Sequence, residues 1–185
     1  YDAQQALVEY TLFSAHLLPQ AEYEAALQDY LTSVLGVTDY RINAVEQDLI
    51  PMTDQPFPRR AGRRVLNIGT RGGRVKPSTG YAFQRIQQDN AAIVRSLLTH
   101  GHPFAIPTPA ARYRFFDTIL LQILYRRGDL AARIFTALFE NNPIQRLFRF
   151  LDEEDHLWGN LQVLASVPPW PFLAAWARLK LLRRL

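Results

Sequence analysis

The stretch RVLNIGTRGGRVKPSTGY, from Arg64 to Tyr81, decides how the rest of the chain is interpreted. Its short apolar run, Val65–Ile68, predicts a buried strand. A glycine-rich segment follows at Gly69–Gly73, and a second small polar cluster, Ser78–Gly80, opens a long amphipathic pattern that is typical of a helix. The order predicts a strand, a glycine-rich loop and a helix start, where bare backbone N–H groups favour an anion.

The same residues also suit an ordinary strand-to-helix turn in which Ser78 or Thr79 caps the helix. The glycine spacing matches neither GxGxxG nor GxxxxGK[ST], so no nucleotide-binding pattern is present. Local chemistry therefore leaves the anion site and the plain turn equally open.

Composition limits the classes of protein to consider. With 185 residues and 48% apolar content, the chain can form one domain with a core, or a domain and an appendage. The absence of cysteine excludes disulfides and thiolate metal sites, and the spacing of His100 and His102 gives no reason to expect a metal. The net charge is +4, and no apolar run reaches the roughly 18 residues of a spanning helix. The chain starts in patterned sequence at Tyr1 without a methionine, so a fragment or a processed product is expected.

Hydrophobic periodicity predicts a mixed first part and a helical second part. The predicted strands are 6–13, 39–50 and 65–68, and the predicted helices before residue 103 are 19–35 and 78–100. From residue 110 onward only helices are predicted, with breaks at Gly128, Pro143 and Pro168. Three short strands make a poor sheet by themselves, which indicates that the sheet lacks some of its partners.

Glu9 lies in the middle of the first predicted strand, ALVEYTLF. A glutamate in a half-exposed strand commonly points to solvent. The functional alternative is a carboxyl group that faces a cavity.

Seven basic residues surround the opening stretch: Arg59, Arg60, Arg63, Arg64, Arg71, Arg74 and Lys76. Nucleic-acid binding is one interpretation. Against it, no aromatic residues are interleaved with the basic ones and no reader motif occurs. A phosphate-bearing cofactor or a solvated loop fits as well.

The last predicted helix, 170–185, is apolar on most sides. Lys180, Arg183 and Arg184 form a narrow stripe beside Trp176. This pattern is typical of a helix that lies in a membrane interface. It suits equally a C-terminal helix docked on a core with a solvated basic edge.

Several motifs follow one another along nearly the whole chain. They are VEYT at 8–11, YRI at 40–42 with Glu46, IPM at 50–52, IGTRGG at 68–73, KPSTGY at 76–81, FFD at 115–117, IFTALFENNP at 134–143, FLDEE at 150–154 and PPWPFL at 168–173. Together these motifs resemble the lycopene cyclases, the flavin-dependent enzymes that form carotenoid rings. The PSTGY segment is the most specific of them.

The resemblance implies an α/β fold, that of a two-domain Rossmann-type flavoprotein that binds FAD and NAD(P). This chain would be its C-terminal half, α+β in itself, with a helical C-terminal region. Residues 1–58 would end the β-sheet substrate domain and residues 59–102 would return to the FAD-binding domain. Residues 103–185 would form the helical region, a candidate for membrane association. The family's opening strand–GxGxxG–helix is absent here, so this stretch by itself is expected to be inactive.

The resemblance also names candidate site residues. The flavin-binding candidates are Gly69, Thr70, Gly72, Gly73, Pro77, Ser78, Thr79 and Gly80. Thr70 stands where related flavoproteins often have an aspartate, so it is assigned no ribitol contact. Glu9 matches the first acid of the family's Leu-Glu-Glu-Thr motif, and Tyr10 replaces the second. Glu9 is therefore the candidate catalytic acid, and no metal site is expected.

The implied activity is that of a lycopene β-cyclase, an intramolecular lyase or isomerase of carotenoid biosynthesis. A proton starts the redox-neutral closure of the ends of lycopene to β-ionone rings, giving γ- or β-carotene. Reduced FAD, with NAD(P)H as reductant, would stabilise the carbocation electrostatically. Burial would keep the carboxyl of Glu9 protonated. Because the substrate dissolves in membranes, a cytoplasmic protein held peripherally on the inner face of the cell membrane is expected.

Two other functions are considered. The first is a non-catalytic, lipid- or carotenoid-binding helical module in which the glycine loop is merely structural. The second is a basic nucleic-acid binder, ranked last because its basic residues bracket a loop and leave the helix faces uncovered. Flavin absorbance of the purified protein separates the cyclase from the module.

Overall fold

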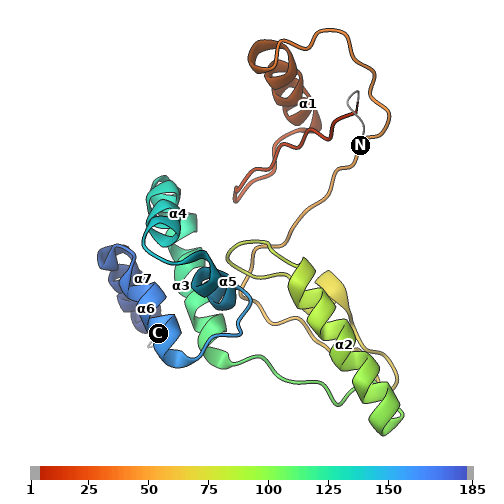
Figure 1. Cartoon of the computed structure of the whole chain (residues 1–185), viewed down its shortest axis with the longest axis vertical. Coiled ribbons are helices and arrows are strands. Elements are labelled where there is room, and N and C mark those ends of the chain that lie inside the picture. Colours follow the sequence, from red (N-terminus) through yellow and green to blue (C-terminus); the bar gives the residue numbers. More distant parts are fainter. Residues whose placement is uncertain (1–4, 183–185) are drawn as a thin grey trace. The chain divides into compact units, whose positions relative to one another are not determined.

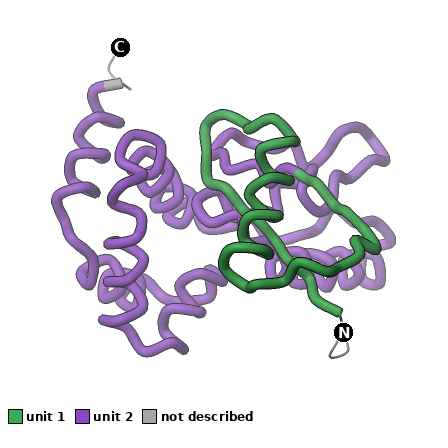
Figure 2. Tube along the Cα trace, turned by 90° about the horizontal axis from the view of Figure 1, so that it is seen from above, with its two compact units in different colours: residues 1–48 green, residues 49–185 purple. Residues whose placement is uncertain are grey.

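The structure of the chain is a computed structural model in which residues 5–182 are described. The chain divides into two compact units, Tyr1–Asp48 and Leu49–Leu185, which Figure 2 colours separately. The domain boundaries expected near residues 58 and 102 stay predictions.

The first unit contains one helix. Helix α1, Gln20–Asp29, continues into a single π-helical turn, Tyr30–Val34, and the helix predicted over 19–35 is thereby confirmed. Gly36 follows with φ of +67°, a left-handed conformation that glycine adopts without a steric penalty. Outside the helix the described residues of this unit have no regular secondary structure, and Tyr10 contacts Tyr23 with ring centroids 5.7 Å apart.

The strands predicted at 6–13, 39–50 and 65–68 are wrong for this structure, because residues 5–182 contain no β-strand. The isolated antiparallel bridge between Arg60 and Leu66 is the one pairing of this kind in the described chain. A strand needs a neighbouring strand to satisfy its backbone groups, and β-forming residues without one do not form a strand. The described chain is helical, and the α/β context stays a prediction.

The second unit is built of helices, which confirms the prediction of a helical C-terminal region (Figure 1). Its α-helices are α2 (Phe83–His100), α3 (Ala111–Arg126), α4 (Ala131–Glu140), α5 (Ile144–Leu151), α6 (Leu157–Ala165) and α7 (Pro169–Leu182). Two short 3₁₀ turns, η2 (Gly69–Gly72) and η3 (Gly128–Leu130), precede α2 and α4.

Helix α2 begins at Phe83, not at Ser78 as predicted. The preceding residues close a turn instead, because the Lys76 N–H donates to the Tyr81 carbonyl (2.7 Å) and the Gly80 N–H donates to the Lys76 carbonyl (2.9 Å). Gly80 has φ of +73°, which no α-helical residue adopts. The N-cap is Ala82, so neither Ser78 nor Thr79 caps the helix.

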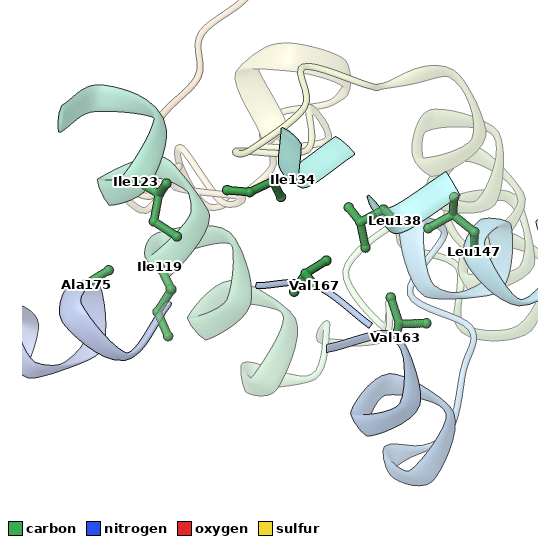
Figure 3. Close-up of a cluster of buried hydrophobic side chains, with 8 residues drawn as sticks. All are labelled: Ile119, Ile123, Ile134, Leu138, Leu147, Val163, Val167 and Ala175. Atoms are coloured by element: carbon green, nitrogen blue, oxygen red, sulfur yellow. The ribbon is translucent and has the colours of Figure 1, made fainter. Parts of the chain in front are cut away.

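The core of the second unit lies among the helices after residue 110 (Figure 3). Helix α3 packs on α7 and α5 packs on α6. The buried apolar side chains are Ile119, Ile123, Ile134, Leu138, Leu147, Val163, Val167 and Ala175. The predicted helices after residue 110 therefore share one apolar core.

Replacing Leu147 with alanine is expected to destabilise the protein by about 2–5 kcal/mol. Leu147 is 0% exposed, so the substitution leaves a cavity that its neighbours fill only in part. Chemical denaturation measures the loss. The matched control is Leu98→Ala on α2, where the side chain is 84% exposed and the expected change is within about 0.5 kcal/mol. Equal losses in the two variants would contradict this packing.

Helix α7 is docked on the core through one face. Ala175 is buried there and Phe172 and Leu179 pack beside it, whereas Trp170 and Leu181 are exposed. The Lys180 ammonium lies 4.0 Å from the centroid of the Trp176 ring. The other two members of the predicted basic stripe, Arg183 and Arg184, lie outside the described residues. Across residues 5–182, no helix has both the length and the apolar character needed to cross a membrane.

Candidate functional site

The side chain of Arg59 holds the glycine-rich loop. Its Nη1 donates to the carbonyls of Asn67 (2.8 Å) and Gly72 (3.3 Å). Its Nη2 donates to both carboxylate oxygens of Asp89 on α2, at 2.8 and 2.9 Å. Arg74 adds a second cation 3.6 Å from Asp89. Two arginines and one buried aspartate therefore fix the loop against α2.

The glycines of this loop are required mainly by the chain's own packing. A Cβ on Gly72 would lie 2.5 Å from the Asn67 carbonyl oxygen, and one on Gly73 would lie 3.0 Å from Cβ of Phe57. A Cβ on Gly80 would lie 3.1 Å from Ile50. Gly69 differs, because no atom lies within 4 Å of the Cβ position. Gly69 is therefore the one of these four that faces open space.

The Gly73→Ala variant is expected to lose about 1–2 kcal/mol of folding free energy. Gly73 has φ of +69°, which is unfavourable for alanine, and the new methyl group would press on Phe57. Thermal or denaturant unfolding measures the effect. Gly128→Ala is the control, because its added Cβ meets no atom within 4 Å and the expected change is below about 1 kcal/mol.

The seven basic residues around the loop do not form one surface. Arg59 and Arg74 are paired with Asp89, and Lys76 is buried at 4% exposure. The guanidinium of Arg60 lies 4.1 Å from the centroid of the Phe104 ring. Arg63, Arg64 and Arg71 are exposed. Three of the seven basic residues therefore stabilise the loop through internal contacts, and this argues against a continuous basic surface that binds nucleic acid.

A buried charge network, Lys76–Asp117–Glu153–Arg85, lies beside the loop. The Lys76 ammonium is 3.2 Å from Asp117 of α3 and 3.2 Å from Glu153 after α5. Arg85 of α2 is 3.0 Å from the same Glu153 oxygen. Two cations thus balance two carboxylates, as buried charges require. The network brings together the segments KPSTGY, FFD and FLDEE.

Ser78 completes the network by donating its hydroxyl hydrogen to Asp117 Oδ1 at 2.5 Å. Burial raises the pKa of Asp117, while the Lys76 charge and the Ser78 hydrogen bond oppose that rise. Asp117 is 3% exposed and Ser78 is 2% exposed, so Ser78 relies on Asp117 for hydrogen bonding, and Asp117 relies on Ser78 and Lys76.

Glu153 has a positive φ of +65°, alone among the described residues other than glycine. It follows the end of α5, where the Glu153 N–H bonds to the Phe150 carbonyl (3.3 Å) and the Glu154 N–H to the Arg149 carbonyl (2.9 Å). These two bonds define a Schellman motif, whose left-handed position is usually glycine. A side chain in this conformation costs about 1–2 kcal/mol. The structure therefore places a strained residue at the centre of the charge network.

A cavity of about 40 Å³ lies against the network. Its polar wall includes Ser78, Thr79 and Asp117, and its apolar wall includes Phe116 and Phe150. The Thr79 hydroxyl oxygen is buried and has no hydrogen-bond partner. The volume suffices for an ordered water molecule and is too small for a carotenoid ring.

The candidate residues fall in different places. Glu9 belongs to the first unit, where its side chain is exposed and Oε1 accepts a hydrogen bond from the Thr11 hydroxyl at 2.5 Å. The flavin-binding candidates belong to the second unit, as two groups. Gly69, Thr70, Gly72 and Gly73 form the η2 turn and its end, and Pro77, Ser78, Thr79 and Gly80 form the following turn. The two groups are joined through Arg74, Val75 and Lys76.

Sequence reasoning missed the charged partners of the loop. The sequence places Lys76 in the basic cluster around the loop, and it shows Asp117 and Glu153 only as members of the motifs FFD and FLDEE. One signal was available: Asp117 interrupts the apolar pattern of its helix, and an acid in such a position is buried only when it is paired. Its partner could not be read from the sequence, because Lys76 is 41 residues away.

Comparison with known proteins was informative at the level of the family. No match was found among curated proteins or among solved structures. The family described as lycopene cyclase protein matches residues 1–177. The matched range includes Glu9, the glycine loop and all four members of the charge network. On this match, which spans nearly the whole sequence, the chain belongs to the lycopene cyclase family.

Proposed function

We propose that the chain functions in a lycopene β-cyclase, an intramolecular lyase or isomerase that closes the ends of lycopene to β-ionone rings. The family match over residues 1–177 carries the proposal, because the family implies carotenoid biosynthesis. The products would be γ- and β-carotene. The reaction is redox-neutral: an alkene carbon gains a proton, a carbon–carbon bond closes the ring, and a neighbouring carbon loses a proton.

The proposed cofactor is reduced FAD, with NAD(P)H as reductant, bound in a two-domain Rossmann-type flavoprotein. When bound, reduced flavin would supply negative charge close to the developing carbocation. The candidate residues fit this group in part. The space beside Gly69 is free of other atoms, since an added Cβ would meet none within 4 Å. Thr70 is exposed, and the buried Thr79 hydroxyl lacks a hydrogen-bond partner. The Ser78 hydroxyl, by contrast, is already used by Asp117.

Glu9 is the proposed proton donor. The Thr11 hydroxyl bonds to Oε1 of Glu9, which leaves Oε2 as the oxygen that would carry the proton. The exposed carboxyl needs cover from the substrate, since apolar surroundings raise the pKa of a carboxylic acid. A bound polyene chain supplies such surroundings and also keeps water from the cation.

The proposed location is the cytoplasmic, inner face of the cell membrane, where a peripheral protein can reach lycopene. Two observations on α7 support this proposal: the apolar side chains of Trp170 and Leu181 are exposed, and the cation Lys180 lies over the ring of Trp176. The helix would lie in the interface, with its buried face kept on the core.

The test is to incubate the full-length protein with lycopene in vesicles, with and without chemically reduced FAD. The expected product has the mass of lycopene and contains β-ionone rings. In heavy water it carries one deuterium for each ring formed. A correctly folded protein that is free of flavin and binds lycopene without converting it would contradict the cyclase and favour a carotenoid-binding module.

A further inference from the structure

The backbone strain at Glu153 indicates a task for its carboxylate. The residue occupies the position of the Schellman motif where glycine is the ordinary choice, and glutamate is strained there. Its side chain is largely buried, at 13% exposure, and one oxygen contacts both Lys76 and Arg85. Strain that persists in a structure is a sign that the surroundings require the residue.

The contacts of the network converge on one short segment. Lys76 begins the turn that precedes α2, and its ammonium is held by Asp117 and Glu153. Ser78, two residues on, is held by Asp117. The turn is thus anchored through two side chains, in addition to the backbone bonds from Lys76 to Tyr81 and from Gly80 to Lys76. Thr79, whose buried hydroxyl lacks a partner, lies inside these anchors.

We propose that Glu153 and Asp117 are positioning residues for the candidate FAD-binding turn 76–81. The helical region after residue 110 thereby sets the geometry of a cofactor-binding segment that comes earlier in the chain. The inference rests on the proposed function, since it assigns the turn to FAD. It adds that the affinity for FAD depends on two carboxylates that need not contact it.

The test compares three substitutions at position 153 in the full-length protein. Glu153→Ala removes the carboxylate and keeps the unfavourable φ, whereas Glu153→Gly removes the carboxylate and relieves the strain. Glu153→Gln keeps an oxygen that can accept a hydrogen bond at the same place, but removes the negative charge. FAD affinity is measured by quenching of flavin fluorescence, and folding is measured separately by thermal unfolding without FAD.

We expect FAD to bind about tenfold more weakly in both the alanine and the glycine variants, with glutamine between them and wild type. The glycine variant should unfold at a higher temperature than the alanine variant. The proposal would be overturned if FAD affinity changed only in proportion to folding stability. In that case the glycine variant would bind FAD as tightly as wild type. Glu154→Gln is the matched control, because Glu154 is exposed and bonds to Gln88, and its affinity should equal that of wild type.

The outcomes keep the two proposals apart. A wild-type protein that is folded but does not bind FAD refutes the cofactor assignment in the proposed function. A wild-type protein that binds FAD, together with unchanged affinity in the glycine variant, refutes only the positioning role. Asp117→Asn provides a second measurement on the other carboxylate, and it should weaken FAD binding in the same direction.

Discussion

The Glu9→Gln variant of the full-length protein loses lycopene cyclisation by about 10²–10⁴-fold while its FAD absorbance is retained, if Glu9 is the proton donor. Glutamine has nearly the shape of glutamic acid, but its amide cannot give a proton to an alkene. The Thr11 hydroxyl can still donate to the amide oxygen, so the local backbone should be preserved. Product analysis by chromatography measures the loss.

The matched control for this prediction is Glu22→Gln. Glu22 is an exposed glutamate in the first turn of α1, in the same unit as Glu9. Its variant should produce cyclised carotene at the wild-type rate. Ordinary β-carotene production by Glu9→Gln would remove Glu9 as the acid, whatever the state of the flavin.

Breaking the buried pair between Lys76 and Asp117 is expected to cost about 3–5 kcal/mol of folding free energy. The two side chains are 4–5% exposed and 3.2 Å apart. Lys76→Met leaves Asp117 without its cation, and Asp117→Asn leaves Lys76 with Glu153 as its remaining close carboxylate. Lys76→Met therefore strands the charge of Asp117 in a region with little water, whereas the loss in Asp117→Asn is expected to be smaller, because Lys76 keeps its contact with Glu153.

A double-mutant cycle separates the pair from its surroundings. The variant with both substitutions should be more stable than the sum of the single losses predicts, by about 1–3 kcal/mol. Denaturant unfolding of the four proteins supplies the numbers. Strict additivity would show that the two groups do not interact in solution.

The helical elements could be predicted because helix signals are local. An apolar side chain at every third or fourth position marked α3, and Gly128 marked its end. The strand predictions were wrong because strand formation depends on pairing with a distant segment. Val65–Ile68 has the composition of a strand, but a strand exists only if another segment pairs with it, and here a single bridge to Arg60 is present.

In the candidate site, too, the features with a local sequence signal could be predicted and the contacts between distant residues could not. The glycine loop was identified because three glycines within five residues are a local signal. The sequence does not show why glycine is needed at positions 72 and 73. The reason is packing, because a Cβ atom there would meet the carbonyl of Asn67 and the side chain of Phe57. Ser78 was expected at a helix start and is instead bonded to Asp117, 39 residues away. Periodicity and spacing contain no information about such distant partners.

The charge network has a consequence for how the second unit comes apart. The contact between Lys76 and Glu153 joins residues 77 positions apart, and closing so long a loop is entropically costly before the intervening helices have formed. We therefore infer that the contact forms late during folding. Interactions absent from the transition state govern the rate of unfolding more than the rate of folding. The network would then slow unfolding of the native state. Its loss would raise the rate of unfolding and leave the rate of refolding nearly unchanged.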